Sequence, residues 1–209
     1  MQLSDNSCLK FFQRDWPDKK QIGPELRKLS SSELDHWESL TASSVSPKPV
    51  ENSEKIWRQI LDPTHWDRIK KAFTPIAFQD AETFGLSVNR FAHTNLEQLV
   101  QAAETRVAKW NAENAERPSR RFIAFAIFDS GYLRGLPLTE NGTERLLYVF
   151  DTANADDTSH ADVFRLGGAE EKQASRRARS FLYEIGMKAL HDRNGHPVSP
   201  EEIATLIGS

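Results

Sequence analysis

The chain has 209 residues, and its 27 basic and 30 acidic side chains give a formal net charge of −3. This near-neutral balance argues against a protein that binds nucleic acid through a generally basic surface. The length fits one domain, or one domain with an appendage. The longest apolar run, Phe122 to Phe128, has seven residues. A membrane-spanning helix needs about 20 residues, so we expect no membrane partner.

The cysteine content bears on the compartment. Cys8 is the single cysteine of the chain, so it cannot form an internal disulfide, and alone it cannot build a cysteine-based zinc site. The N-terminal residues show no apolar segment of the kind that a secretory signal contains. The simplest interpretation is a soluble protein in a reducing, cytoplasmic compartment.

Residues 1–50 are polar with scattered apolar side chains and predict an N-terminal appendage with short helices. Ser30 and Glu33 have the spacing of a capping box, which starts a helix. One apolar stripe follows on that helix: Leu34, Trp37 and Leu40. Such a stripe must be buried on another surface. Thr41 to Glu54 is rich in serine and proline, as linkers are. We therefore expect residues 54–209 to form a single globular domain.

The middle of the chain predicts two short helices and one long helix. We expect the short helices at 54–61 and 65–73, where apolar residues recur at helical spacing. Asn95 and Gln98 resemble a cap for a helix at 95–117, whose apolar side chains fall on one face.

The remaining patterns predict an α+β fold. Four segments have the alternating or continuous apolar character of strands: 85–91, 121–129, 145–151 and 161–166. A second long helix is predicted at 169–190. A short C-terminal helix begins near Ser199, with an apolar stripe formed by Ile203, Leu206 and Ile207. We therefore expect a small sheet of about four strands, packed by two longer amphipathic helices, with short helices at both termini.

The most suggestive candidate site is acidic. Its members lie at or near the ends of predicted strands: Asp129, Asp151, Asp157, His160 and Asp162. Carboxylates at the ends of neighbouring strands are able to converge on Mg²⁺ or Mn²⁺, and two such ions clamp a phosphoryl group during hydrolysis. His160 would then act as a base or a ligand. The simpler interpretation is that these carboxylates belong to ordinary turns.

A second candidate lies on the strand at 85–91. Alternation places Ser87 and Asn89 on one side of this strand and Arg90 on the other. The Arg90 guanidinium suits bidentate pairing with a carboxylate or a phosphate. A covered arginine needs a partner, and three carboxylates are candidates: Asp129, Asp151 and Asp162. A structural ion pair is the interpretation that we favour.

A third candidate is a basic stripe on the helix at 169–190, formed by Arg176, Arg177 and Arg179. Such a stripe suits contact with a nucleic-acid backbone or an acidic protein surface. Neighbouring glutamates dilute it, so a solvated helix face is the simpler interpretation.

The sequence contains no G-x-S-x-G elbow, P-loop or G-x-G-x-x-G motif. We therefore expect a non-catalytic protein-binding or accessory module of a larger assembly, without a cofactor. Trp37 is the predicted anchor, because aromatic residues concentrate binding energy at interfaces. Support for nucleic acid as a partner is weak. The alternative is a metal-dependent hydrolase or nuclease that uses the acidic group with Mg²⁺ or Mn²⁺.

Overall fold

The computed structural model of the protein describes residues 5–74, 76–139, 142–167 and 172–208. The strands are β1 (Lys55–Asp62), β2 (Trp66–Asp67), β3 (Ala72–Phe73), β4 (Leu86–Arg90), β5 (Arg121–Asp129), β6 (Leu147–Phe150), β7 (His160–Arg165) and β8 (Leu190–His191). The helices are α1 (Asp5–Gln13), α2 (Ile22–Leu26), α3 (Ser31–Glu38), α4 (Leu96–Glu113), α5 (Ser130–Arg134), α6 (Lys172–Lys188) and α7 (Pro200–Gly208). Short 3-10 turns are η1 (Lys19–Gln21), η2 (Gln79–Glu82) and η3 (Phe91–His93).

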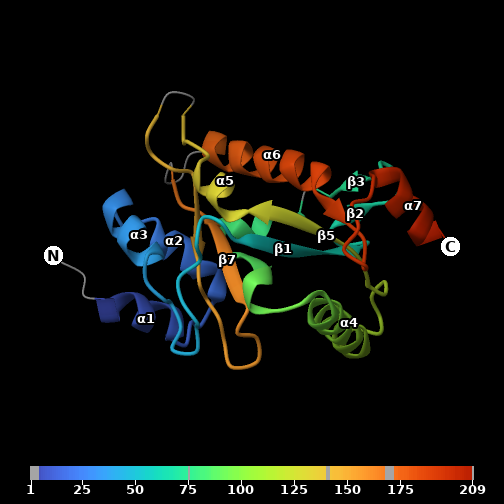
Figure 1. Ribbon diagram of the computed structural model, residues 1–209, viewed down its shortest axis with the longest axis horizontal. Helices are drawn as coiled ribbons and strands as arrows, with labels where there is room; N and C mark the ends of the chain where they lie inside the picture. The colour runs from blue at the N-terminus through green and yellow to red at the C-terminus, as the bar shows by residue number, and fades with distance from the viewer. Residues whose placement is uncertain (1–4, 75, 140–141, 168–171, 209) are drawn as a thin grey trace.

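Six of the strands form one antiparallel sheet in the order β6-β7-β4-β1-β5-β8, and β2 pairs with β3 in a separate hairpin. Helices lie on both sides of this sheet (Figure 1). The α+β class predicted from the sequence is confirmed, while the predicted size of about four strands was too small. The four predicted strands correspond to β4, β5, β6 and β7.

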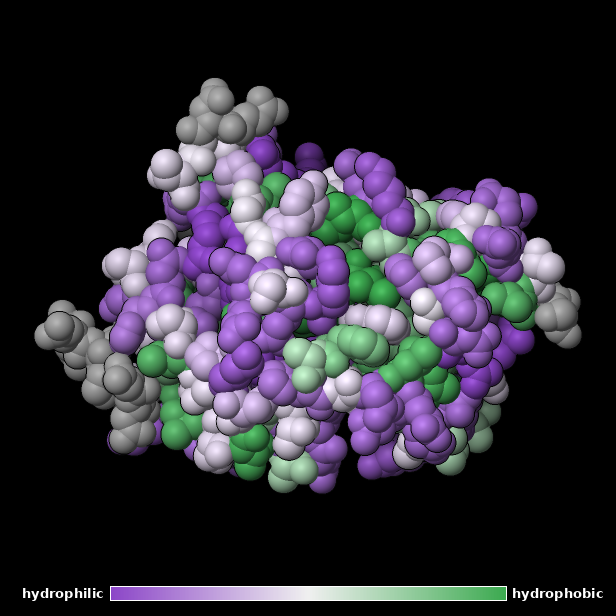
Figure 2. Space-filling view, in the orientation of Figure 1, coloured by the Kyte–Doolittle hydropathy of each residue, from purple (hydrophilic) through white to green (hydrophobic). Residues whose placement is uncertain are grey.

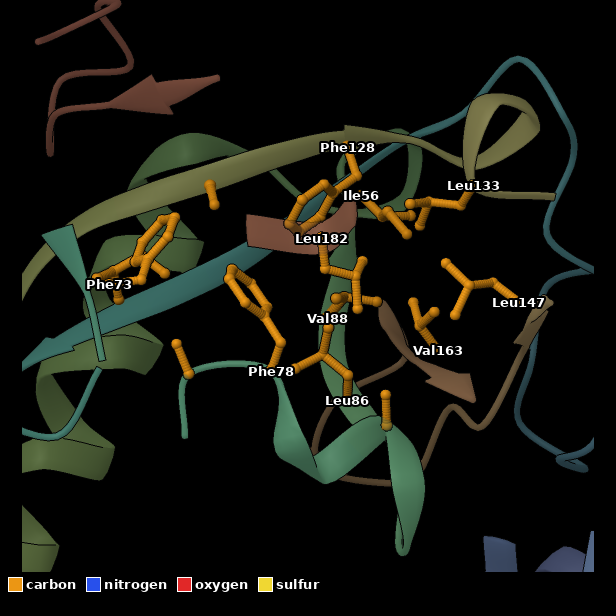
Figure 3. Close-up of a cluster of buried hydrophobic side chains, with 14 of the residues drawn as sticks. Ile56, Phe73, Phe78, Leu86, Val88, Phe128, Leu133, Leu147, Val163 and Leu182 are labelled. Carbon is orange, nitrogen blue, oxygen red and sulfur yellow. The ribbon is translucent and has the colours of Figure 1, made fainter. Parts of the chain in front are cut away.

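One face of the sheet packs against α6 to form the largest core. Figure 3 shows strand side chains from this face converging with Leu182 of α6. Ala174 and Ala178 of the same helix are also buried in this core. Phe73 of the hairpin and Phe78 extend the core at one end, with their rings 5.0 Å apart between centroids. Small residues on α6 let the helix lie close to the large strand side chains.

The opposite face of the sheet carries two smaller clusters. In the first, buried side chains of the N-terminal helices pack on β6 and β7: Cys8, Leu26, Leu34, Trp37, Tyr148, Phe150 and Phe164. In the second, α4 packs on β1 and β5: Leu99, Ala103, Trp57, Phe122 and Phe125. Figure 1 shows α1 and α4 on the side of the sheet opposite α6, at different ends. The two clusters therefore leave the middle of this face between them.

Two predicted helices are strands in the structure. Residues 54–61 correspond to the central strand β1, and residues 65–73 contain the β2–β3 hairpin. The apolar residues of β1 recur at helical spacing, yet Ile56 and Ile60 are buried against α6 while Trp57 is buried against α4. A strand that is buried on both faces has no simple alternation. Its periodicity alone therefore could not separate it from a helix.

Helix starts were predicted more successfully. Ser30 and Glu33 form the expected capping box, and Asn95 and Gln98 form another at the start of α4. The predicted helix at 169–190 corresponds to α6, although residues 169–171 lie outside the described residues, as do residues 1–4 of the predicted appendage. Within the described ranges, no helix is both long enough and apolar enough to cross a membrane.

Side chains from elsewhere in the fold bind the backbone groups of Val149 in β6, a strand at the edge of the sheet. The backbone N–H of Val149 donates to Glu38 Oε1 at 2.5 Å, and Arg134 Nη2 donates to the Val149 carbonyl at 3.2 Å. Arg134 Nε also lies 2.9 Å from Glu38 Oε1. This ion pair thereby satisfies the outward-facing polar groups of an edge residue, which would otherwise be open to another strand.

The predicted linker at 41–54 is joined by several hydrogen bonds to β4, to α5 and to the residue after β6. Arg90 Nη1 donates to the Lys48 carbonyl at 2.7 Å, and the Ala42 N–H donates to the Asp151 carbonyl at 3.1 Å. Ser130 Oγ donates to the Glu51 carbonyl at 2.5 Å. The division into an appendage, residues 1–50, and a globular domain, residues 54–209, stays a prediction. These hydrogen bonds link the linker region to the predicted domain.

Candidate functional site

Two adjoining cavities lie on the sheet face between α1 and α4. One has a volume of about 720 Å³ and is lined by Asn89 of β4, by η3 and α4, and by Asn154 and residues 156–160. The other has a volume of about 750 Å³ and is lined by residues of α1, the segment 42–45 and the start of β4. Asn154 and His160 line both. We call the two cavities together the central groove. Figure 2, in the orientation of Figure 1, shows a molecular face that is mainly hydrophilic, with hydrophobic areas between polar ones.

Four polar side chains from β4 and β7 line the central groove: Ser87, Asn89, His160 and Asp162. Residues two apart on a strand point to the same side, so each strand contributes a pair. The antiparallel register places Ser87 opposite Asp162 and Asn89 opposite His160. His160 is therefore the diagonal neighbour of Ser87, a position within reach of a long side chain.

The hydrogen bonds of His160 indicate which ring nitrogen carries the hydrogen when the ring is neutral. Its Nε2 lies 2.5 Å from Ser87 Oγ, while its Nδ1 lies 3.2 Å from the Thr152 carbonyl oxygen and 3.0 Å from Thr152 Oγ1. A carbonyl oxygen only accepts, so in the neutral ring Nδ1 carries the hydrogen. Nε2 is then free to accept a hydrogen bond from the Ser87 hydroxyl.

Asp162 supports this arrangement through the Thr152 hydroxyl. The Thr152 hydroxyl donates to Asp162 Oδ2 at 2.7 Å, so its oxygen lone pairs face His160. Asp162 Oδ1 also lies 3.9 Å from His160 Nε2. The side chains of His160 and Asp162 are 17% and 13% exposed. A positive charge on His160 would therefore have a carboxylate 3.9 Å away in a partly buried site.

Ser87 is also held through its backbone. Arg58 Nη1 donates to the Ser87 carbonyl at 3.0 Å, and Arg58 Nη2 lies 3.4 Å from Asp80 Oδ2. The registered pairs between β1 and β4 are limited to Ile56 with Arg90 and Trp57 with Asn89. Arg58 thus supplies a hydrogen-bond donor to the Ser87 carbonyl, where β1 does not pair with β4.

At the other end of the central groove, Asn89 holds an acidic loop in place. Asn89 Nδ2 donates to Asp157 Oδ2 at 2.8 Å and to Ser159 Oγ at 2.9 Å. The Ser159 hydroxyl and N–H both donate to Asp157 Oδ1. On the opposite wall, burial lowers the pKa of Arg106, and the charge of Asp157 opposes that shift. Asp157 is therefore already engaged in organising the loop.

Two members of the predicted acidic group lie outside the central groove. Asp129 caps α5 by accepting from the Tyr132 N–H at 3.0 Å, and it pairs with Lys55 at 3.1 Å. Asp151 is fully buried and lies 3.3 Å from Arg90 Nη1, yet burial raises its pKa to about 6. These two carboxylates have the turn and structural roles of the simpler interpretation.

The other three members line the central groove, but no more than two of them line the same cavity. Asp157 and His160 line one cavity, whereas His160 and Asp162 line the other. In the part of the chain that the structure describes, no three His, Cys, Asp or Glu side chains are grouped so that they could hold a metal ion. The proposed Mg²⁺ or Mn²⁺ chemistry therefore gains no support from a ligand cluster.

Arg90 is fully buried and binds protein groups on every side. It forms a bidentate pair with Glu54, and its remaining donors reach Asp151 and the carbonyl oxygens of Lys48 and Pro49. Sequence reasoning foresaw a carboxylate partner and included Asp151, but it missed Glu54. With its donors occupied in this way, Arg90 has the surroundings of a structural ion pair.

The predicted interface anchor Trp37 is 3% exposed. It packs among the N-terminal helices, with its ring centroid 5.4 Å from that of Phe11. In the C-terminal helix, Ile203 and Ile207 are buried in the main core, whereas Leu206 is 55% exposed. Both apolar stripes are thus covered mainly by the chain itself.

The arginine stripe lies on the outer surface of α6. Arg176 and Arg179 line a cavity of about 400 Å³ together with Tyr183 and Glu184, while Arg177 is half-buried. The acidic Glu184 shares this cavity with the two arginines, as the simpler interpretation of a mixed, solvated helix face expected.

Sequence reasoning singled out Ser87 and His160 separately and missed their pairing. Strand alternation placed Ser87 with Asn89 on one face, but the register between β4 and β7 was not available from the sequence. Thr152 was also missed, because a threonine in a turn carries no signal of its own. Comparisons with known proteins add no assignment, since no protein-family model, no curated protein and no solved structure matches the chain.

Proposed function

We propose that the protein is a binding module that holds an extended segment of a protein partner in the central groove. The observation that carries this proposal is the continuity of the two cavities, which share Asn154 and His160 and together run across the sheet. A site made of two adjoining cavities suits an extended chain better than a compact small molecule, which typically occupies a single enclosed pocket.

The lining of the central groove suits a peptide in its chemistry. Hydrogen-bonding side chains such as Gln98, Asn154 and Thr158 line the part near α4 and match a polar main chain. The part near α1 adds Val45 and Phe84, which are 42% and 39% exposed. Exposed apolar groups beside polar ones are typical of the anchor positions of protein interfaces.

The test uses the full chain with a photoreactive amino acid at position 45 in the native host. The proposal expects cross-linking to a partner that the same probe at position 69 does not capture. Ile69 is the matched control, because it is 94% exposed on the hairpin and does not line the central groove.

The purified partner then provides the quantitative test. Phe84→Asp should weaken its binding about tenfold or more, because an apolar anchor is replaced by a charge, whereas Ile69→Asp should leave binding unchanged. Equal capture from positions 45 and 69, or unchanged affinity of Phe84→Asp, would rule the proposal out. Thermal melting of each variant separates lost binding from lost folding.

A further inference from the structure

We propose that Ser87 and His160 form a nucleophile–base pair that transfers the acyl group of a carboxylic ester. This inference goes beyond the binding role and does not depend on it. It begins from the short contact between Ser87 Oγ and His160 Nε2, 2.5 Å, within a cavity of about 750 Å³ that both residues line. A serine is a weak nucleophile until an adjacent base accepts its proton.

The surroundings of His160 supply the other requirement, which is a fixed tautomer. The Thr152 carbonyl and hydroxyl engage Nδ1, so Nε2 is the acceptor that faces Ser87. Asp162 orients the Thr152 hydroxyl and lies 3.9 Å from Nε2. His160 would therefore act as the base, Thr152 would hold its tautomer, and Asp162 would supply the opposite charge. A serine hydrolase is recognised by these roles and their geometry, not by a sequence motif.

The chemical step balances without a metal or a cofactor. The Ser87 hydroxyl proton moves to His160 Nε2 as Oγ bonds to the ester carbonyl carbon. The bond from that carbon to the alkoxy oxygen then breaks, and the leaving oxygen takes the proton from Nε2 to form the alcohol. Water next attacks the Ser87 acyl ester, gives a proton through Nε2 back to Oγ, and releases the carboxylic acid.

The walls of the cavity indicate which esters fit. Phe12, Ile22 and Phe164 contribute apolar surface to its lining, and Arg14 and Lys19 line the same cavity. An ester with an apolar acyl chain would bury that chain on the aromatic side. The reactive carbonyl would then lie near Ser87, between the apolar and the cationic parts of the wall.

The test treats the full-length protein with an alkyl fluorophosphonate and maps the adduct by mass spectrometry. Labelling is expected at Ser87 and not at Ser44, which is a second serine lining the same cavity. Ser87→Ala should abolish the adduct, and Ser180→Ala, at an exposed position of α6 outside the central groove, should leave its rate unchanged. His160→Gln should slow labelling by about a hundredfold or more, because it removes the base.

Two results would overturn the proposal: an unlabelled Ser87 in the folded wild-type protein, or His160→Gln labelling at the wild-type rate. If His160→Gln fails to fold, Ser87→Cys gives an independent test. The new thiol beside His160 should react with iodoacetamide faster than the buried Cys8 of the same chain, and equal rates would also reject the pair. None of these measurements requires the protein partner, so they can fail while the binding proposal stands.

Discussion

The guanidinium of Arg90 holds both carboxylate oxygens of Glu54, with Nε 2.8 Å from one oxygen and Nη2 2.7 Å from the other. The side chains are 0% and 4% exposed. Arg90 lies at the end of β4, and Glu54 directly precedes β1, so the pair ties the start of the central strand to the strand that carries Ser87. Arg90 also binds the carbonyl oxygens of Lys48 and Pro49.

Glu54→Gln should therefore lower the free energy of unfolding by about 3–5 kcal/mol, because it leaves the buried Arg90 charge without its main partner. Urea denaturation followed by circular dichroism measures this loss. Glu51→Gln is the matched control, since Glu51 pairs with Lys48 at an exposed site and should change stability by about 0.5 kcal/mol or less. Similar losses in the two variants would contradict the structural role of the Arg90–Glu54 pair.

Trp37→Ala should destabilise the fold itself. The indole is 3% exposed beneath α1, and truncation of a buried tryptophan typically costs about 3–5 kcal/mol. Leu206→Ala, at a 55% exposed apolar position of a terminal helix, is the comparison and should cost much less. Chemical denaturation of both variants checks the expected order, and a Trp37→Ala variant of wild-type stability would show that the ring is not core.

His65 should remain uncharged in the folded protein well into the acidic range. Burial, with a smaller contribution from the Arg58 charge, lowers its pKa from 6.5 to about 3. Because the folded value lies below the unfolded one, this group's contribution to stability is fully present above about pH 6.5. It is lost as the pH falls from there toward 3.

A histidine NMR titration measures this directly. The His65 ring signals should stay in the neutral position between pH 8 and 5, because its pKa in the folded protein is about 3. A midpoint for His65 near 6.5 would contradict its buried placement.

Cys8 offers a test of the boundary between the N-terminal region and the rest of the chain. Burial raises the pKa of its thiol to about 12, and its Sγ lies 3.7 Å from the Trp37 carbonyl oxygen. Its cluster includes Tyr148 and Phe150 of β6. We expect the thiol to become reactive only with global unfolding, because the cluster is built from both sides of the boundary.

The rate of alkylation at increasing urea concentrations reports the free energy of the opening that exposes Cys8. Equality with the free energy of global unfolding would show one cooperative unit. A much smaller value would show that residues 1–50 detach as a separate appendage.

Features that depend on residues close together in the sequence were predictable, whereas features that depend on contacts between distant segments were not. Capping boxes at Ser30 and Asn95 are local, since the side chain and the backbone group that it binds are three residues apart. The strand β1 depends on burial by segments that are distant in the sequence, because α6 covers one of its faces and α4 covers the other. Tertiary packing therefore overrode the helical spacing of its apolar residues.

The same division applies to the candidate site. Ser87, His160 and Asp162 were each singled out from the sequence, and so was the alternation that places Ser87 and Asn89 on one face of the strand at 85–91. Their meeting depends on a register between strands that are 73 residues apart at the Ser87–His160 contact. A one-residue slip of β7 would turn His160 to the opposite face of the sheet, so composition and spacing alone could not give the pair.

The cover over Val149 has a consequence for how the molecule behaves among copies of itself. An open edge strand is a template on which identical chains add their own strands and grow into fibrils. Here Glu38 and Arg134 occupy the outward N–H and C=O of that edge residue. The backbone groups of Val149 are then already bound and cannot join a ladder with a strand of another chain. By supplying Glu38, the N-terminal region removes this residue of the edge from strand-to-strand pairing.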